Sequence, residues 1–123
     1  MTFDDVRAIV SRWPGVEDST SYGTPALKVK GKLIARLKED GDTLVALGVD
    51  FNEREALLEA QARVFYITDH YRDYPAVLVR LSKAKRAQVE ALPLRRWRAV
   101  APKKLVKEFE AAVRQPPRDG REP

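Results

Sequence analysis

His70 is the only histidine of the chain, and two aspartates, Asp69 and Asp73, stand close to it in the sequence. A histidine held by a carboxylate can act as a general base, because its ordinary pKa lies near neutrality. Neighbours in an extended segment point to opposite sides, so Asp69 is badly placed to orient His70. The sequence has no GxSxG motif and no second histidine at metal-ligand spacing. We therefore predict no catalytic residue, no metal and no cofactor, and a structural role for His70, with its ring packed on Tyr71, or a role in contacting a ligand.

Tyrosines and basic residues surround this histidine, and a further tyrosine stands near the start of the chain. Such side chains can form a stacking platform for a nucleobase or another planar ligand. Core packing with the hydroxyl at the surface explains the tyrosines about as well. The candidate ligand contacts are Tyr22, Lys28, His70, Tyr71, Arg72 and Tyr74.

Positive charge is concentrated at the C-terminal end of the chain. The net charge is +5, but residues 1–79 hold 10 Lys/Arg against 13 Asp/Glu, whereas residues 80–123 hold 13 against 5. Clustered Lys and Arg attract polyanions, although a solvated helical face would give the same composition. The candidate residues for binding nucleic acid or another anion are Lys83, Lys85, Arg86, Arg95, Arg96, Arg98, Lys103, Lys104 and Lys107.

Within that set, Lys103 and Lys104 fall in the first turn of a predicted helix. That end carries free N–H groups and the positive end of the helix dipole, where acidic residues are normally favoured. Two lysines there suit a bound phosphate or carboxylate, and neighbouring arginines would extend the site. Trp97, which stands between those arginines, is predicted to belong to the core.

Length and composition limit the class of protein. A chain of 123 residues with 44% hydrophobic content fits one globular domain, which we place at residues 1–114, followed by a flexible tail at 115–123. No apolar stretch is long enough to span a membrane, and the acidic N-terminus does not resemble a secretion signal. The absence of cysteine fits a reducing compartment. We expect a soluble cytoplasmic protein.

The first half of the chain predicts a helix followed by a β-meander. Thr2 and Asp5 form a capping box before a helix that ends at Pro14-Gly15. Alternating apolar residues then predict two strands that meet at Lys30-Gly31, and an Asp40-Gly41 turn leads into a third strand. A second helix at 53–61 is predicted from Asn52 as N-cap with Glu55, and from Phe51 packed on Ala56.

The second half predicts two strands and further helices. The strands are 64–68 and 76–81, separated by the polar, aromatic loop 69–75. Ser82 is expected to cap a helix that is bent or interrupted at Pro93, and Pro102 to occupy the first position of a final helix. The order α-β-β-β-α-β-β-α-α predicts an α+β two-layer domain, with an antiparallel sheet of about five strands and helices packed on one face.

Several segments, taken in order, make the chain resemble the MmcQ/YjbR-like family over residues 3 to 109. They are Trp13-Pro14-Gly15-Val16-Glu17, Ser21-Tyr22-Gly23-Thr24-Pro25, Lys28-Val29-Lys30-Gly31-Lys32, Thr68-Asp69-His70-Tyr71 with Tyr74-Pro75, Val77-Leu78-Val79-Arg80-Leu81, and Trp97 with Ala101-Pro102-Lys103. The resemblance implies a fold similar to that of secretion chaperones and a domain labelled as possibly DNA-binding, with no catalytic residues to carry over. Pro93 departs from the family, whose members often have an uninterrupted helix there.

Three functions follow as hypotheses. The first is a non-enzymatic domain that contacts nucleic-acid phosphates through its basic C-terminal helices. The second is a protein-interaction module, chaperone-like or homodimeric, that uses a sheet face or edge. The third is a small-molecule binder with a pocket near Tyr22, Lys28 and His70, which a deep pocket in the structure would favour.

Overall fold

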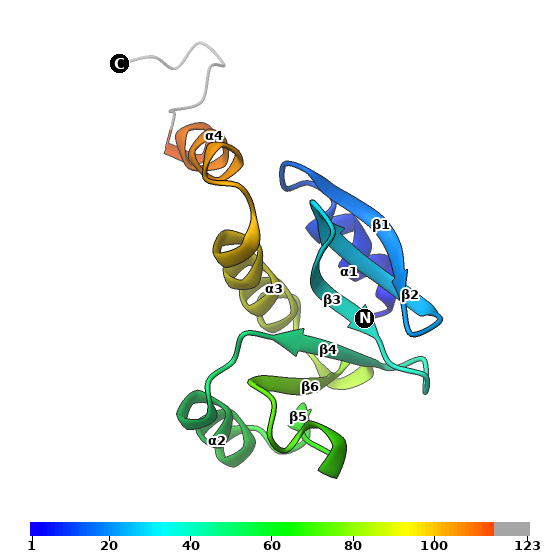
Figure 1. Cartoon of the computed structure of the whole chain (residues 1–123). Helices are drawn as coiled ribbons and strands as arrows, with labels where there is room; N and C mark the ends of the chain where they lie inside the picture. The colour runs from blue at the N-terminus through cyan, green and yellow to red at the C-terminus, as the bar shows by residue number, and fades with distance from the viewer. Residues whose placement is uncertain (115–123) are drawn as a thin grey trace.

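The fold is built on one antiparallel sheet whose strands follow the order β1-β2-β3-β4-β6-β5. The computed structural model describes residues 1–114, and the predicted tail at 115–123 lies outside the described residues. Strands β1 to β4 form a meander, and β6 then pairs with β4 while β5 takes the far edge (Figure 1). The strands are β1 (Val16–Ser21), β2 (Thr24–Val29), β3 (Lys32–Leu37), β4 (Thr43–Leu47), β5 (Phe65–Tyr66) and β6 (Ala76–Arg80).

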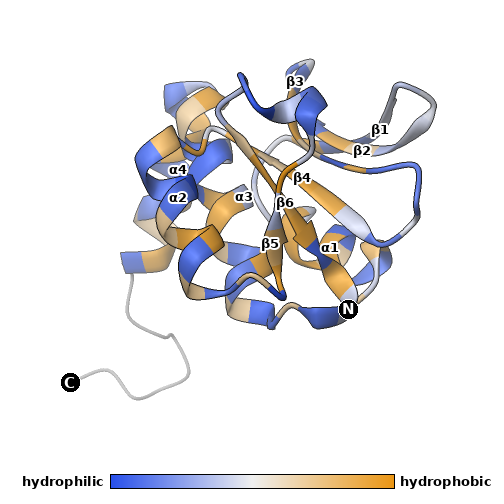
Figure 2. Cartoon of the chain, turned by 90° about the horizontal axis from the view of Figure 1, so that it is seen from below, coloured by the Kyte–Doolittle hydropathy of each residue, from blue (hydrophilic) through white to orange (hydrophobic). Residues whose placement is uncertain are grey.

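Helices α1 (Phe3–Val10) and α3 (Arg86–Val100) pack on one face of this sheet and close the main core. Helix α2 (Phe51–Ala60) lies beside β5, and α4 (Lys103–Arg114) continues beyond α3 (Figure 1). Orange apolar residues of the strands and of α3 meet inside, while α2 and α4 show many blue polar residues outside (Figure 2). The predicted α+β class, with an antiparallel sheet and helices on one face, is confirmed.

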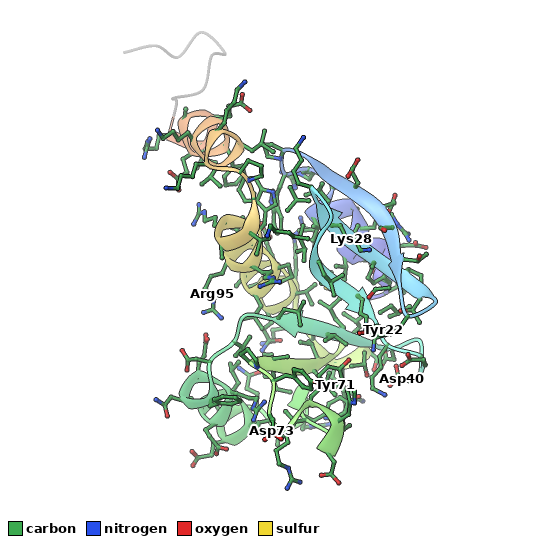
Figure 3. All side chains as sticks on the ribbon, viewed as in Figure 1. Tyr22, Lys28, Asp40, Tyr71, Asp73 and Arg95 are labelled. Atoms are coloured by element: carbon green, nitrogen blue, oxygen red, sulfur yellow. The ribbon has the colours of Figure 1, made fainter. Side chains whose placement is uncertain are left out.

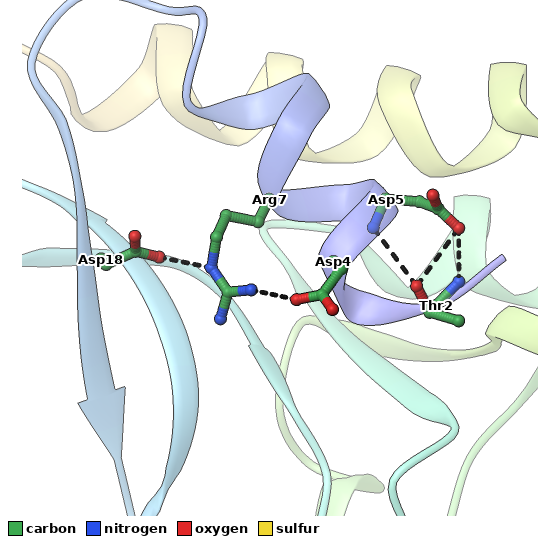
Figure 4. Close-up of polar contacts among 5 residues, drawn as sticks. All are labelled: Thr2, Asp4, Asp5, Arg7 and Asp18. Carbon is green, nitrogen blue, oxygen red and sulfur yellow. Dashed lines mark hydrogen bonds and ion pairs between the residues drawn. The ribbon is translucent and has the colours of Figure 1, made fainter.

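The start of the chain forms as its local sequence predicts. The Thr2 side chain accepts a hydrogen bond from the Asp5 N–H, and the Asp5 carboxylate accepts one from the Thr2 N–H at 2.8 Å (Figure 4). The Asp5 pKa is lowered chiefly by that backbone hydrogen bond. Arg7 then joins α1 to the sheet, because its Nε donates to Asp18 of β1 at 2.7 Å (Figure 4).

The sheet has six strands, one more than the sequence indicated. The additional strand is β1, which pairs with β2 along its whole length. Apart from Val16 its residues are polar, and none is fully buried, because β1 is an edge strand. A strand of this kind lacks the apolar alternation on which the prediction depended. The strand predicted at 64–68 is confirmed but shorter.

The starts of helices α2, α3 and α4 all differ from the prediction. Helix α2 is capped by Asp50, whose carboxylate accepts the Glu53 N–H at 2.8 Å, rather than by Asn52. Phe51 does not pack as a staple on Ala56; it is 48% exposed, and its ring lies against the Arg54 guanidinium.

Helix α3 also starts later than predicted. Lys85 is its N-cap residue, because the Ser82 hydroxyl donates instead to Asp42 at 2.7 Å. Pro93 stands inside the helix and does not end it. The Pro93 ring is buried in apolar packing. Because proline has no backbone N–H, no donor is left unpaired at this position.

Trp97 joins the C-terminal helices to the rest of the core. It is fully buried, as predicted, and its Nε1 donates to the Pro14 carbonyl at 3.0 Å. The ring centroid of Phe109 of α4 lies 5.1 Å from that of Trp97. Gly15, with φ +77°, allows a close approach of Leu105, because a Cβ there would lie 2.7 Å from the Leu105 Cδ1. Helix α4 begins at Lys103, with the Pro102 carbonyl accepting the first N–H groups, so the proline stands one position earlier than predicted.

Candidate functional site

The face of the sheet that the helices leave uncovered carries a pocket of about 730 Å³. Successive side chains of a strand point to opposite faces, so Leu44 and Val79 meet the helices while Val45, Leu47 and Leu78 meet the other side. The loop between β5 and β6 folds over this second face. The lining residues are Tyr22, Leu33, Arg36, Lys38, Glu39, Val45, Leu47, Thr68, Asp69, His70, Tyr71 and Tyr74. Figure 3 places the labelled Tyr22 and Tyr71 on neighbouring parts of the sheet and loop.

Arg36 of β3 is the buried charge of this pocket, with only 6% of the residue exposed. Its Nη2 donates to the Tyr71 hydroxyl at 2.9 Å. Its Nη1 has longer contacts, of 3.2 to 3.4 Å, to the Thr24 hydroxyl, the Leu37 carbonyl and the Glu39 carboxylate. Within residues 1–114, its Nε–H and one Nη2 hydrogen have no acceptor. Two donors of a buried guanidinium thus remain for a ligand.

Arg36 is cationic at physiological pH, as arginine side chains are in proteins. Burial by itself lowers the pKa, but the hydrogen bond to Tyr71 and the charge of Glu39 outweigh burial, and the pKa is raised. Glu39 is the only carboxylate paired with it in the described part of the chain, at 3.4 Å, and the Glu39 side chain is 58% exposed. The positive charge is therefore poorly neutralised from within the protein.

Arg54 of α2 holds the loop that forms one wall of the pocket. Its Nη1 donates to the carbonyls of Tyr71, Tyr74 and Ala76, and its Nη2 donates to the carbonyl of Arg72, at 2.8 to 3.2 Å. Arg54 is 5% exposed, and its Nε has no partner among residues 1–114. The Tyr71 and Tyr74 carbonyls also accept the N–H groups of Tyr74 and Ala76, so Arg54 adds to the backbone bonds that fix the loop.

The structure brings together four of the six predicted ligand contacts. Tyr22, His70, Tyr71 and Tyr74 line the pocket, whereas Lys28 does not and lies further along the sheet in Figure 3. The rings of His70, Tyr71 and Tyr74 lie close together, with the His70 centroid 4.7 Å from that of Tyr71 and 5.8 Å from that of Tyr74. The predicted packing of His70 on Tyr71 is present.

Arg72 and Asp69 form an ion pair with each other at the surface, so Arg72 does not line the pocket. The segment Asp69–Tyr71 is a 3₁₀ turn rather than an extended strand, which corrects the geometry assumed from the sequence. Asp69 therefore turns to Arg72 and does not orient His70. No pairing of the histidine with a carboxylate is present among residues 1–114.

The basic residues of the second half are not gathered at one place. Lys83, Lys85 and Arg86 stand at the start of α3, and Lys103, Lys104 and Lys107 lie on α4. The 15 residues of α3 separate the two groups, a length of about 22 Å at 1.5 Å per residue.

The three arginines between those groups are occupied within the protein. Arg95 forms two hydrogen bonds to Glu53, at 2.7 and 2.8 Å, and Arg98 lies near Glu110 at 3.9 Å. The Arg96 Nε donates to the Leu33 carbonyl at 2.9 Å, and burial lowers the pKa of Arg96. These contacts make the arginines part of the fold, because each links α3 to another element.

Residues 1–114 contain neither a membrane-spanning helix nor a cluster of metal ligands. No helix in that range is long and apolar enough to cross a membrane. No cluster of three or more His, Asp or Glu side chains in the same range could hold a metal ion.

Comparisons with known proteins agree with the fold and leave the function open. The structure superposes on the crystal structure of the Deinococcus radiodurans protein DR2400, a DUF419 domain, with a TM-score of 0.68, 21% identity, and coverage of 99% of this chain and 96% of that one. Uncharacterized proteins of Mycobacterium tuberculosis and Mycobacterium bovis are 29% identical over 122 residues, which cover 88% of this chain and 95% of each relative. No protein-family model matches the sequence. The chain thus has the α+β fold of a DUF419 domain.

Proposed function

We propose that the protein is a binding domain that takes a small organic anion into the pocket on the open face of the sheet. The proposal rests on the buried guanidinium of Arg36, which has unused donors in a pocket lined largely by apolar and aromatic side chains. Ligand pockets in proteins commonly combine apolar walls with a few fixed polar groups. A carboxylate or phosphate matches a guanidinium in both charge and hydrogen-bond geometry.

Charges at the rim support an anionic ligand. Lys38 lines the pocket and forms no ion pair within the described part of the chain. The two acids that also line it, Glu39 and Asp69, are each paired with an arginine. Lys38 is therefore the lining charge that no ion pair within residues 1–114 neutralises.

The proposal predicts that charge reversal at Lys38 weakens binding of a small anion. Titration of 2-naphthoate, followed by calorimetry, is expected to give a dissociation constant about tenfold weaker for Lys38→Glu than for the unaltered protein, equivalent to about 1.4 kcal/mol. Arg36→Gln is expected to lose more, because charged hydrogen bonds are worth about 1.5–3 kcal/mol each.

Lys32→Glu is the matched control for this experiment. Lys32 stands at the other end of the same strand, is exposed, and does not line the pocket. It changes the net charge by the same amount, so it separates a local contact from the general field of the protein. Equal affinities for the Lys38→Glu and Lys32→Glu variants would contradict the proposal.

We also propose that the chain belongs to the MmcQ/YjbR-like family and acts in the cytoplasm. The order and spacing of the segments around Trp13, Tyr22, His70 and Trp97 support the family, and the likeness to a DUF419 domain agrees with the fold expected for it. The absence of cysteine supports a reducing compartment.

Binding of nucleic acid remains a second candidate function, favoured by Lys103, Lys104 and Lys107. All three are exposed on α4, and none forms an ion pair with another described residue. If they contact phosphates, DNA or RNA affinity should fall steeply between about 50 and 200 mM salt, and Lys103→Glu/Lys104→Glu should abolish it. Fluorescence anisotropy measures this, and no binding at low salt would remove this candidate. The edge of β1, which no further strand covers, supports the protein-interaction module, the second hypothesis from the sequence.

A further inference from the structure

Tyr22 occupies a backbone position that its residue type does not favour. It stands with Gly23 in the two-residue turn between β1 and β2, and both residues have positive φ, 53° and 78°. This is the pattern of a type I′ hairpin turn, in which Asn or Asp is preferred at the first position and Gly at the second. A tyrosine at positive φ is uncommon, because its Cβ crowds the neighbouring carbonyl.

Packing within the protein does not explain this residue either. Tyr22 is 86% exposed, so its ring gains little from burial. The turn between β2 and β3 has the same backbone pattern at Lys30 and Gly31, with φ of 50° and 79°, and there the exposed residue is an ordinary polar one. An aromatic ring is therefore not a requirement of the turn.

The surroundings of the ring point to a ligand. Tyr22 lines the pocket, and the guanidinium carbon of Arg36 lies 5.3 Å from the centre of its ring. Tyr74, which is 54% exposed, lines the same pocket. Of the large apolar side chains that residues 1–114 leave exposed, these two line the same pocket, whereas Phe51 and Val113 do not line it.

We infer that the ligand of this pocket is a planar aromatic anion, whose ring stacks on Tyr22 while its carboxylate or phosphate meets Arg36. This inference rests on the proposed function and gives the chemical class of the ligand. An exposed ring beside a buried cation suits such a molecule, because aromatic faces attract planar ligands and the anion neutralises the guanidinium. Tyr22 is then a specificity-determining residue, retained in a turn that another residue type would fit better.

The test compares planar and saturated probes on the full chain and two variants. 2-Naphthoate and decahydro-2-naphthoate have the same charge and carbon skeleton, but only the first has a planar aromatic ring. The unaltered protein is expected to bind 2-naphthoate about tenfold more tightly, as stacking on an aromatic side chain predicts. Tyr22→Asn is expected to lose that preference, and also to raise the melting temperature by a few degrees, because asparagine suits the turn. 2-Naphthyl phosphate, used in parallel, shows which anionic group is preferred.

Lys30→Asn is the matched control. It introduces the same residue, asparagine, at the turn between β2 and β3, which lies at the opposite end of β2 and outside the pocket. Lys30→Asn should therefore raise the melting temperature and leave the affinities for both naphthoates unchanged. If the two naphthoates bind equally and Tyr22→Asn changes neither affinity, the inference is wrong while the proposed function stands. If no probe binds the unaltered protein, the proposed function fails and the inference fails with it.

Discussion

Replacement of Arg54 with alanine is expected to lower the free energy of unfolding by about 3 kcal/mol or more. The guanidinium donates to four carbonyls of residues 71–76; the bonds to Tyr71 and Ala76 are buried, and those to Arg72 and Tyr74 are partly buried. Each buried carbonyl that loses its donor costs about 1–3 kcal/mol. The substitution also removes the buried, unpaired Nε–H of Arg54. Since the desolvation of that group destabilises the native protein, its removal makes the net loss of stability smaller.

Urea denaturation measures this effect, and two variants define its cause. Arg54→Lys should also be destabilised, because an ammonium group has fewer donors and no planar fork with which to reach the same carbonyls. Arg72→Ala is the matched control, since its exposed side chain contacts only Asp69 and is expected to change stability by less than about 1 kcal/mol. A change of that small size for Arg54→Ala would show that the loop is held by other contacts. The Arg54→Ala variant should also lose the pocket wall formed by Tyr71 and Tyr74.

Trp97→Ala is expected to destabilise the protein by about 4 kcal/mol, within the range for removing a large buried aromatic side chain. The variant loses the hydrogen bond to the Pro14 carbonyl and the contacts with Trp13 and Phe109. Trp97 is fully buried, so a large cavity would remain.

The same variant should release α4 from the rest of the molecule. No residue of α4 is fully buried, and its contact with the core comes from Leu105, Val106 and Phe109. Hydrogen exchange of the α4 amides should therefore speed up more than that of α1. Trp97→Phe keeps an aromatic ring and should lose only about 1–2 kcal/mol, mainly from the missing N–H donor. Equal losses for the two substitutions would contradict a role for the ring in holding α4.

Local signals predicted the elements that depend on neighbouring residues. The capping box of Thr2 and Asp5 and the turns at Lys30-Gly31 and Asp40-Gly41 involve atoms only a few residues apart, so the sequence contains the whole interaction. Local sequence did not decide between Asp50 and Asn52 as the cap of α2. Both residues can accept the N–H, and the packing of Phe51 on Arg54 accompanies the earlier start.

The sequence predicted some of the pocket residues. It missed the others because their partners are far away in the sequence. Tyr22, His70, Tyr71 and Tyr74 were found because an aromatic cluster is visible in the residue types. Arg36 looked like an outward-facing residue of an alternating strand, and its burial depends on Tyr71, which is 35 residues away. Arg54 is flanked by Glu53 and Glu55, like a residue of a solvated helix, and its acceptors are main-chain carbonyls that have no sequence signal.

In the basic C-terminal half, the sequence left open whether the cations share one surface, because a charge count does not show which cations already have partners. Arg95 is paired with Glu53 from a different helix, and Arg96 with the carbonyl of Leu33 from β3. Only the fold brings these partners to the arginines.

Chemical-shift mapping tests most directly whether the chain binds an anion at Arg36. Uniformly ¹⁵N-labelled protein would be titrated with 2-naphthoate, and the backbone amide shifts of residues 1–114 followed. The account predicts the largest changes at Arg36, Leu47, His70 and Tyr71, which line the pocket from three separate segments of the chain. Changes confined to Lys103, Lys104 and Lys107 of α4, or no change at any amide, would contradict it.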